Sequence, residues 1–380
     1  MNFIQDEDSQ QLQEMYRDFA EKEVKPIAKE IDESMRFPSE NIPKMAEMGL
    51  LGIPFPEEFG GAGMTTLSYI QCVEELSKVC ATTGVIVSAH TSLCATPIYT
   101  YGTDAQKEKY LKPLASGEQL GAFALTEPVA GTDASMQKST AVLEGDHYVL
   151  NGSKIFITNA GFADVYIVFA MTDKSKGTKG ISAFILEKDF PGFSVGTHEV
   201  KMGIRGSSTC ELFFDNCIVP KENLLGEEGR GFNIAMATLD GGRIGVAAQA
   251  LGIAEGAIEE TIKYVNERVQ FGRTISKFQN TQFELAQMRA NTEAAKLLVY
   301  QAACAKDNHE RFTHFAAMAK LVASRNASDV TRRCLQLFGG YGYSSDYPIE
   351  RMMRDAKITE IYEGTSEVQM MVIAGWMGVK

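Results

Sequence analysis

Along the first 120 residues, apolar positions recur every three or four residues, which is the spacing of one buried helix face. Residues 4–31 show this pattern between charged positions, with Ile4 as its first apolar residue, and residues 67–79 show it again. The segment 85–101 carries few charges and predicts a helix that is buried on most sides. We therefore predict an all-helical region over residues 1–120.

The pattern changes near residue 120 to short runs rich in β-branched and aromatic residues. These runs predict strands over 147–150, 154–158, 165–169, 181–186 and 211–214, with turns at Asn151-Gly152 and Pro191-Gly192. Because the gaps between the runs are too short for crossover helices, the sheet should be largely antiparallel, as a barrel or a sandwich. We assign residues 121–230 to this β-region.

Helical spacing returns after residue 230, first over 244–265 and then over about 281–306, 313–338 and 368–377. The chain is thus predicted to have an α+β fold with three domains. These are an N-terminal all-helical domain (1–120), a central β-domain (121–230) and a C-terminal helical bundle (231–380).

Composition narrows the function classes. A formal net charge of −12 disfavours nucleic acid or an anionic membrane as the main partner, because both bind basic surfaces. The seven cysteines show no C-x-x-C spacing and there are five histidines, so the chain has no zinc-site pattern. It also lacks a run of about 18 apolar residues and a signal-peptide pattern. We expect a cytoplasmic protein without a metal site or a membrane span.

One carboxylate, Glu363, lies between Tyr362 and Gly364 near the C-terminus. Glycine lets the backbone approach a ligand, and an aromatic neighbour excludes water. Loss of water raises the pKa of a carboxylate towards neutrality, where a general base works. Taken alone, Glu363 is equally compatible with a solvated residue at a helix end. The common nucleotide and hydrolase motifs, from G-x-G-x-x-G to G-x-S-x-G, are absent.

Two runs in the β-region combine residues that bind flat or charged ligands. Residues 125–133 join threonine hydroxyls to Gly131, and their amides can bind a heteroaromatic ring or a phosphate, or form a plain turn. Phe156, two residues before Thr158, can cover a ring or fill the core of the sheet.

Three further runs lie in the C-terminal region. Residues 239–243 are predicted to begin a helix with Asp240 as its cap, so that free amides face an anion or a thioester. Arg268 can hold a diphosphate through its planar guanidinium, or lie on the surface. Gly339, Gly340 and Gly342 follow a helix and permit close approach of the backbone to a ligand, beyond what a helix cap requires.

Together, the runs 125–133, 156–159, 268–272, 338–342 and 353–365 resemble the acyl-CoA dehydrogenase family over nearly the whole chain, most closely its bacterial short-chain (butyryl-CoA) type. This resemblance implies a C-terminal four-helix bundle, FAD bound between the β-domain and the bundle, and a homotetramer built as a dimer of dimers. It also implies α,β-dehydrogenation of a short-chain acyl-CoA, such as butyryl-CoA to crotonyl-CoA, with electrons passed to electron-transferring flavoprotein.

The resemblance also assigns roles to residues. Glu363 is implied to be the catalytic base that removes the α-proton while hydride passes to flavin N5. Some relatives carry the base where this chain has Gly242, so Glu363 is the single candidate. The implied FAD contacts are Phe123, Leu125, Thr126, Gly131, Thr132, Phe156, Ile157, Thr158, Thr365 and Glu367, with Arg268, Gln270, Phe271, Phe278, Gln279, Gln336, Leu337, Gly339 and Gly340 serving the FAD of a partner subunit. The implied substrate contacts are Thr132, Asp240, Arg243, Tyr362 and Gly364, with the acyl-pocket floor near Cys94, Ala95 and Ile98.

Two alternatives remain open at this point. One is a sibling on the same fold, either an acyl-CoA oxidase or a dehydrogenase for another acyl group. The other is a non-catalytic subunit that binds acyl-CoA or a flavoprotein, although such a subunit would not need Glu363.

Overall fold

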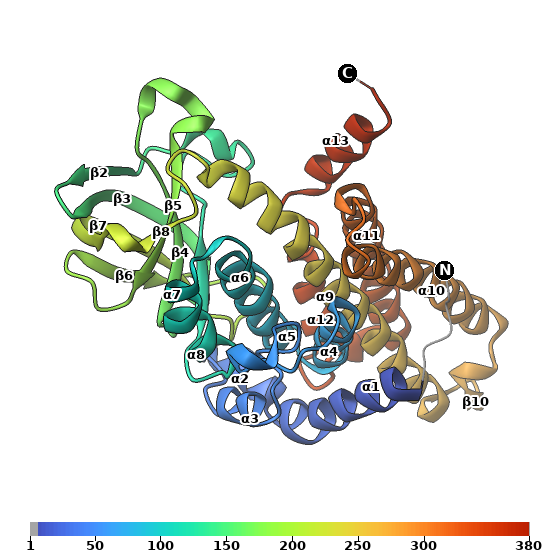
Figure 1. The fold of residues 1–380 in the computed structure, drawn as a ribbon. Helices are drawn as coiled ribbons and strands as arrows, with labels where there is room; N and C mark the ends of the chain where they lie inside the picture. Colours follow the sequence, from blue (N-terminus) through green and yellow to red (C-terminus); the bar gives the residue numbers. More distant parts are fainter. Residues whose placement is uncertain (1–6, 380) are drawn as a thin grey trace.

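A computed structural model describes residues 7–379, so Ile4 lies outside the described residues. A sheet forms one side of the molecule, and the N-terminal and C-terminal helices pack together beside it (Figure 1). The predicted α+β order of helices, sheet and helices is therefore confirmed. The N-terminal helices are α1 (Glu7–Phe19), α2 (Ala28–Ser34), α3 (Asn41–Glu47), α4 (Thr66–Val79), α5 (Ala81–Ser88), α6 (Thr96–Tyr101), α7 (Asp104–Gln106) and α8 (Lys112–Ala115).

The buried helix predicted over 85–101 is present with one irregularity. Helices α5 and α6 are joined by a π-helical segment, Ala89–Ala95, whose seven residues are all buried. π-Helical turns inside α-helices are frequent at functional sites because they redirect side chains locally. Leu93, in this segment, is one of the residues that surround the candidate site described below.

The central region forms one eight-stranded sheet. Its strands are β1 (Gly121–Ala124), β2 (Thr140–Glu144), β3 (His147–Thr158), β4 (Val165–Met171), β5 (Ile181–Glu187), β6 (Phe193–His198), β7 (Thr209–Pro220) and β8 (Leu224–Leu225). Their order is β6-β7-β3-β2-β4-β5-β8, with β1 added beside β4. Only the β1–β4 and β2–β4 pairs are parallel, so the largely antiparallel prediction is confirmed.

The turn predicted at Asn151-Gly152 is wrong. β3 runs without interruption through both residues, and a register shift against β7 absorbs Gly152 as an irregularity of the ladder. Long cross-strand pairing with β7 outweighs the local turn preference of Asn-Gly, because the ladder satisfies the backbone groups on both sides of it. The predicted turn at Pro191-Gly192 does connect β5 to β6, and Gly192 has a positive φ of 83°.

The C-terminal region consists mainly of three long helices, α9, α10 and α11. The elements of this region are α9 (Gly231–Glu267), β9 (Val269–Gln270), β10 (Arg273–Thr274), α10 (Gln279–Asp307), α11 (Thr313–Phe338), α12 (Ile349–Ile358) and α13 (Ser366–Trp376). One hydrophobic cluster extends from α4 through α9 to α10 and α11, so the N-terminal and C-terminal helices share a core.

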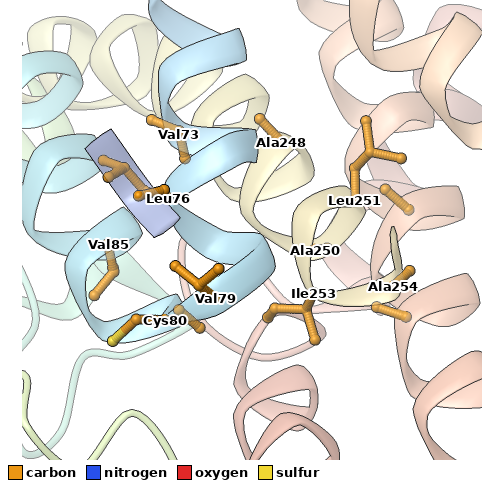
Figure 2. Close-up of a cluster of buried hydrophobic side chains, with 14 of the residues drawn as sticks. Val73, Leu76, Val79, Cys80, Val85, Ala248, Ala250, Leu251, Ile253 and Ala254 are labelled. Atoms are coloured by element: carbon orange, nitrogen blue, oxygen red, sulfur yellow. The ribbon is translucent and has the colours of Figure 1, made fainter. Parts of the chain in front are cut away.

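The contact between α4 and α9 places the candidate site. Figure 2 shows Val73 of α4 near Ala248 of α9, and Leu76 and Leu251 belong to the same buried cluster. Gly252 permits the close approach, since a Cβ there would lie 2.2 Å from the Glu74 carbonyl oxygen. The backbones of α4 and α9 are therefore in close contact, and α9 also approaches the loop that follows α12.

Candidate active site

Glu363 lies in the loop between α12 and α13, in a strained backbone conformation. Its φ is 53°, in the left-handed region that residues with a Cβ rarely adopt. Its carboxylate atom Oε2 is buried and has no hydrogen-bond partner within the described residues. Strained backbone and unsatisfied buried polar atoms both lower the stability of the folded state. They are therefore found mostly at functional sites, where a function requires them. Both features thus favour a ligand-facing Glu363 over a solvated one.

Gly242 of α9 faces the carboxylate of Glu363. A Cβ at Gly242 would lie 2.2 Å from Oε2 of Glu363 and 2.7 Å from Cδ2 of Leu93. The two chain positions at which the resemblance allows a base therefore converge on the same point in space. Any side chain at Gly242 would occupy the volume that Glu363 now uses.

The prediction that Asp240 caps a helix is wrong. α9 begins at Gly231, so Asp240 and the amides after it lie inside the helix and cannot bind an anion. Instead, Asp240 forms an ion pair of 2.6 Å with Arg243 and accepts a hydrogen bond of 2.8 Å from Thr313 on α11. Nε of Arg243 is buried and has no partner within residues 7–379, so this guanidinium keeps a donor for a ligand.

Burial sets the ionisation of this cluster. Loss of water raises the pKa of Glu363 to about 7, and the positive charges of Lys320 and Arg243 oppose that rise. Burial also lowers the pKa of Lys320 to about 8 and raises that of Asp240. A carboxylate with a pKa near neutrality is both ionised and basic enough to take a proton at physiological pH.

Tyr362 is turned into the protein and held there. Its hydroxyl donates a hydrogen bond to Oε1 of Gln249 on α9, whose amide donates to the carbonyl oxygen of Ala81 at 2.9 Å. Burial raises the pKa of the Tyr362 phenol well above its usual value, so the group stays neutral. Tyr362 therefore forms a fixed wall beside Glu363.

Of the residues expected near the acyl-pocket floor, Cys94 has a thiol that faces the sheet. Cys94 directs its thiol at the Val165 carbonyl oxygen, 3.6 Å away, and packs with Ala95 and Ile98 in the cluster beneath the sheet. Its neighbour Leu93 is the residue whose side chain lies next to Gly242 and Glu363. The helix was correctly predicted, Leu93 lies next to Gly242 one position before Cys94, and the place of the acyl-pocket floor stays a prediction.

The β-domain residues gather around the segment between β1 and β2. Phe156 lies in β3, two residues before its end, with a positive φ of 58°, and is 59% exposed, which excludes the interpretation of a core phenylalanine. Ile157, by contrast, is 2% exposed inside the sheet, so only its main chain can contact a ligand. Phe123 and Thr158 are half-buried, Leu125 is buried, Thr126 is half-buried, and Gly131 and Thr132 lie in the exposed part of the same segment.

A second group of predicted residues lines a cavity of about 640 Å³ at the end of the bundle. Arg268, Gln270, Gln336, Leu337, Gly339 and Gly340 line it, together with Tyr341 and others. A Cβ on Gly339 or Gly340 would meet nothing within 4 Å, so the glycines border open space. Cζ of Arg268 lies over the ring of Tyr341, 5.2 Å from its centroid, in a cation–π contact.

This cavity lies far from the β-domain residues. β10, next to the cavity, and the sheet are at opposite ends of the molecule (Figure 1). Phe271, at the tip of the β9–β10 hairpin, is 94% exposed, with Phe278 half-buried 6.2 Å from it between ring centroids. Gln279 begins α10, while Thr365 caps α13 by accepting from the Val368 amide and Glu367 lies in its first turn.

Two buried lysines that were not predicted from the sequence hold these segments. Lys154 donates to the carbonyl oxygen of Leu125 at 3.2 Å and to the Glu127 carboxylate at 2.8 Å, and thereby fixes the segment after β1. Lys320 donates to the carbonyl oxygen of Gly364 at 2.7 Å. The signal was available for Lys320, because it interrupts a helix face of buried alanines that includes Ala316 and Ala323.

The geometry fits a flavin dinucleotide on two grounds. Phe156, an exposed aromatic residue on strained backbone, lies beside hydroxyl-bearing segments of the β-domain. The glycine-bordered cavity that contains Arg268 suits a diphosphate or an adenosine.

In the described part of the chain, none of the helices is both apolar and long enough to cross a lipid bilayer.

The helix–sheet–helix fold thus holds a buried carboxylate oxygen without a hydrogen-bond partner among the described residues, Oε2 of Glu363, opposite Gly242 of α9. Family models for the N-terminal, middle and C-terminal domains of acyl-CoA dehydrogenase match residues 6–118, 122–217 and 229–378. The chain therefore belongs to the acyl-CoA dehydrogenase family.

Individual relatives are similar over almost their full lengths. The short-chain specific acyl-CoA dehydrogenase of Clostridium acetobutylicum is 63% identical over 99% of both chains. The structure of butyryl-CoA dehydrogenase from Megasphaera elsdenii matches with a TM-score of 0.98 and 55% identity, over 99% of this chain and 100% of that one. A chain from a structure of the electron transferring flavoprotein of Acidaminococcus fermentans, described in terms of flavin-based electron bifurcation, matches with a TM-score of 0.98 and 59% identity over 99% of both chains.

Proposed function

We propose that this protein is an FAD-dependent dehydrogenase of short-chain acyl-CoA thioesters, which converts butyryl-CoA to crotonyl-CoA and passes the electrons to electron-transferring flavoprotein. The observation that carries the proposal is the buried, unpartnered Oε2 of Glu363 opposite Gly242. The relatives named for short-chain and butyryl-CoA substrates, and the match to a chain described with electron transferring flavoprotein, support the substrate and the electron acceptor.

Glu363 is proposed to remove the α-proton of the thioester. The C–H bond at the α-carbon breaks, its proton passes to Oε2, and the electron pair stays on carbon as negative charge develops towards the thioester oxygen. FAD, when bound, supplies the acceptor for the β-hydrogen as a hydride. The backbone N–H of Glu363 has no acceptor within residues 7–379, so it is available to donate to the thioester oxygen.

The neighbouring residues exclude water and orient the substrate in this proposal. Tyr362 and Leu93 border the carboxylate with apolar surface, which desolvates the base. Arg243, held by Asp240, offers its unpaired Nε along the path of the acyl-CoA, with Thr132 and Gly364 as further contacts.

The FAD contacts stay as predicted, in two sets. Those from the β-domain and from α13 would hold the flavin, with Phe156 packed on the ring. Those around the 640 Å³ cavity would serve the FAD of a partner subunit, because the cavity lies far from the sheet. We accordingly propose a homotetramer with cofactor sites between subunits, and the division into domains 1–120, 121–230 and 231–380. Seven free cysteines favour a reducing, cytoplasmic location.

Substituting Glu363→Gln tests the base. The variant should purify with FAD, yet its flavin should no longer be bleached by butyryl-CoA under nitrogen. Removal of a general base lowers the rate by about 10²–10⁴-fold or more. Glu293→Gln, on the exposed surface of α10, is the matched control and should bleach normally. Near-normal bleaching by Glu363→Gln would refute the assignment, and rapid peroxide formation in air would favour the oxidase alternative.

A further inference from the structure

Lys320 is a lysine in the interior of the helical bundle. It lies in the middle of α11, is 0% exposed, and shares its helix face with the buried residues Ala316, Ala323 and Ala327. Within residues 7–379, no carboxylate oxygen lies within 4.0 Å of its Nζ, so it is not half of an ion pair. A buried cation without a paired anion is costly, and its retention calls for a function.

The ammonium group of Lys320 holds both ends of the loop that carries the base. Its Nζ donates to the carbonyl oxygen of Thr359 at 2.9 Å and to that of Gly364 at 2.7 Å. Thr359 directly follows α12, and Gly364 directly follows Glu363. The two hydrogen bonds therefore connect the start of the loop to the residue after Glu363, whose own φ is positive.

The charge of Lys320 also acts on the carboxylate. Among the groups that lower the pKa of Glu363, Lys320 contributes more than Arg243 of α9. Arg243 is already paired with Asp240, whereas Lys320 has no such partner. The remaining titratable groups around this pair are the neutral phenols of Tyr69 on α4 and Tyr362 in the loop, together with Glu360, which attracts Lys320 from the loop.

We propose that Lys320 is a positioning residue for the base: it locks Glu363 in its reactive conformation through the two loop carbonyls, and it keeps the carboxylate ionised through its charge. This inference rests on the proposed role of Glu363 as the base. Both effects, the anchoring of the loop and the positive charge, come from Nζ of Lys320, and variants that remove one or both can separate them.

Three variants separate charge from loop anchoring. Lys320→Met removes both, Lys320→Gln keeps donors but no charge, and Gln369→Leu removes only a neutral hydrogen bond of 2.8 Å to the same Gly364 carbonyl. For each FAD-loaded enzyme, the rate of anaerobic flavin reduction by saturating butyryl-CoA is measured from pH 5.5 to 9. Because burial lowers the pKa of Lys320 to about 8, the profiles are compared below that pH, where Lys320 is charged and a rate that depends on ionised Glu363 rises with pH.

Loss of the cation should move this rise to higher pH. Without a nearby positive charge the ionised form of Glu363 is less stable, so its pKa is higher. We expect a shift of about one pH unit or more in both Lys320 variants, which means an about tenfold lower rate at a given pH below the plateau. Gln369→Leu should lower the rate equally at all pH values and leave the position of the rise unchanged.

The wild-type enzyme provides the separate test of the proposed function. Its flavin must be bleached by butyryl-CoA at pH 8, and this result does not depend on the role of Lys320. The inference is overturned if Lys320→Met holds FAD and its rate rises at the wild-type pH. It is also overturned if both Lys320 variants fail to fold with FAD, because Lys320 would then be required for the structure alone.

Discussion

Gly242→Ala tests the convergence of α9 and the base loop with the addition of one methyl group. The new Cβ would lie 2.2 Å from Oε2 of Glu363 and 2.7 Å from Cδ2 of Leu93. Both neighbours are the ends of flexible side chains, so they move while the helix backbone stays in place. The substitution should therefore displace the base without unfolding the protein.

The magnitude follows from the geometry. Restoring ordinary contact, which begins near 3.4 Å, requires a movement of Oε2 by about 1 Å. A displacement of this size at a reacting group lowers a rate by about 10²-fold, or about 2.7 kcal/mol in the barrier. Stability should change little, because Ala in place of Gly favours a helix by about 1 kcal/mol while an off-rotamer glutamate costs about as much.

The assay is stopped-flow reduction of the flavin by butyryl-CoA under nitrogen, combined with thermal unfolding of the same samples. Gly241→Ala is the control, because its Cβ would meet only Nζ of Lys306 at 3.5 Å and adds the same methyl group to the same helix. We expect about 100-fold slower reduction for Gly242→Ala, near-normal reduction for Gly241→Ala, and similar melting temperatures. Equal reduction rates in the two variants would show that Gly242 does not face the base.

Two further predictions concern stability. Lys154→Met should destabilise the protein by about 3–5 kcal/mol in urea unfolding and weaken FAD retention, because it leaves the buried Glu127 carboxylate without its cation. The control is Lys176→Met, at an exposed lysine, which should change stability by less than about 0.5 kcal/mol. Equal effects of the two substitutions would contradict the role of Lys154. Burial raises the pKa of Glu363 from 4.5 to about 7, so the folded protein holds a proton that the unfolded chain releases and wild-type stability falls as pH rises through this window. Glu363→Gln should thus raise the melting temperature more at pH 8 than at pH 5, and a gain that is equal at both pH values would refute a buried, titrating Glu363.

Long helices were predicted well from the sequence because their signal is local. α11 spans the predicted residues 313–338, since its small buried residues recur at helical spacing along the whole segment. The two wrong predictions came from short motifs whose local preference is overridden by packing. Asn151-Gly152 lies inside β3 because β7 pairs along it, and Asp240 lies inside α9 because that helix begins earlier, where Gly231 packs against the backbone of Ser182 in β5.

The predictions for the candidate site also differ in whether they depend on residue type or on packing. The pattern of residue types was enough to predict a helical, β and helical architecture, and glycine cannot act as a base at position 242. Residue type alone left Glu363 equally compatible with a solvated residue, and its role as the base stays a prediction from the resemblance. The order of the motifs along the chain was enough to suggest the family.

Only the tertiary structure decided how these residues act on one another. It placed Gly242 against the carboxylate of Glu363, turned Leu93 rather than Cys94 towards the site, and buried Lys320 behind the base loop. The physical reason is that exposure, pKa and steric contact depend on neighbours that are distant in the sequence. Residue type alone settles which groups are available for chemistry, whereas the packing of α4, α9 and α11 sets their distances, their hydration and their charge.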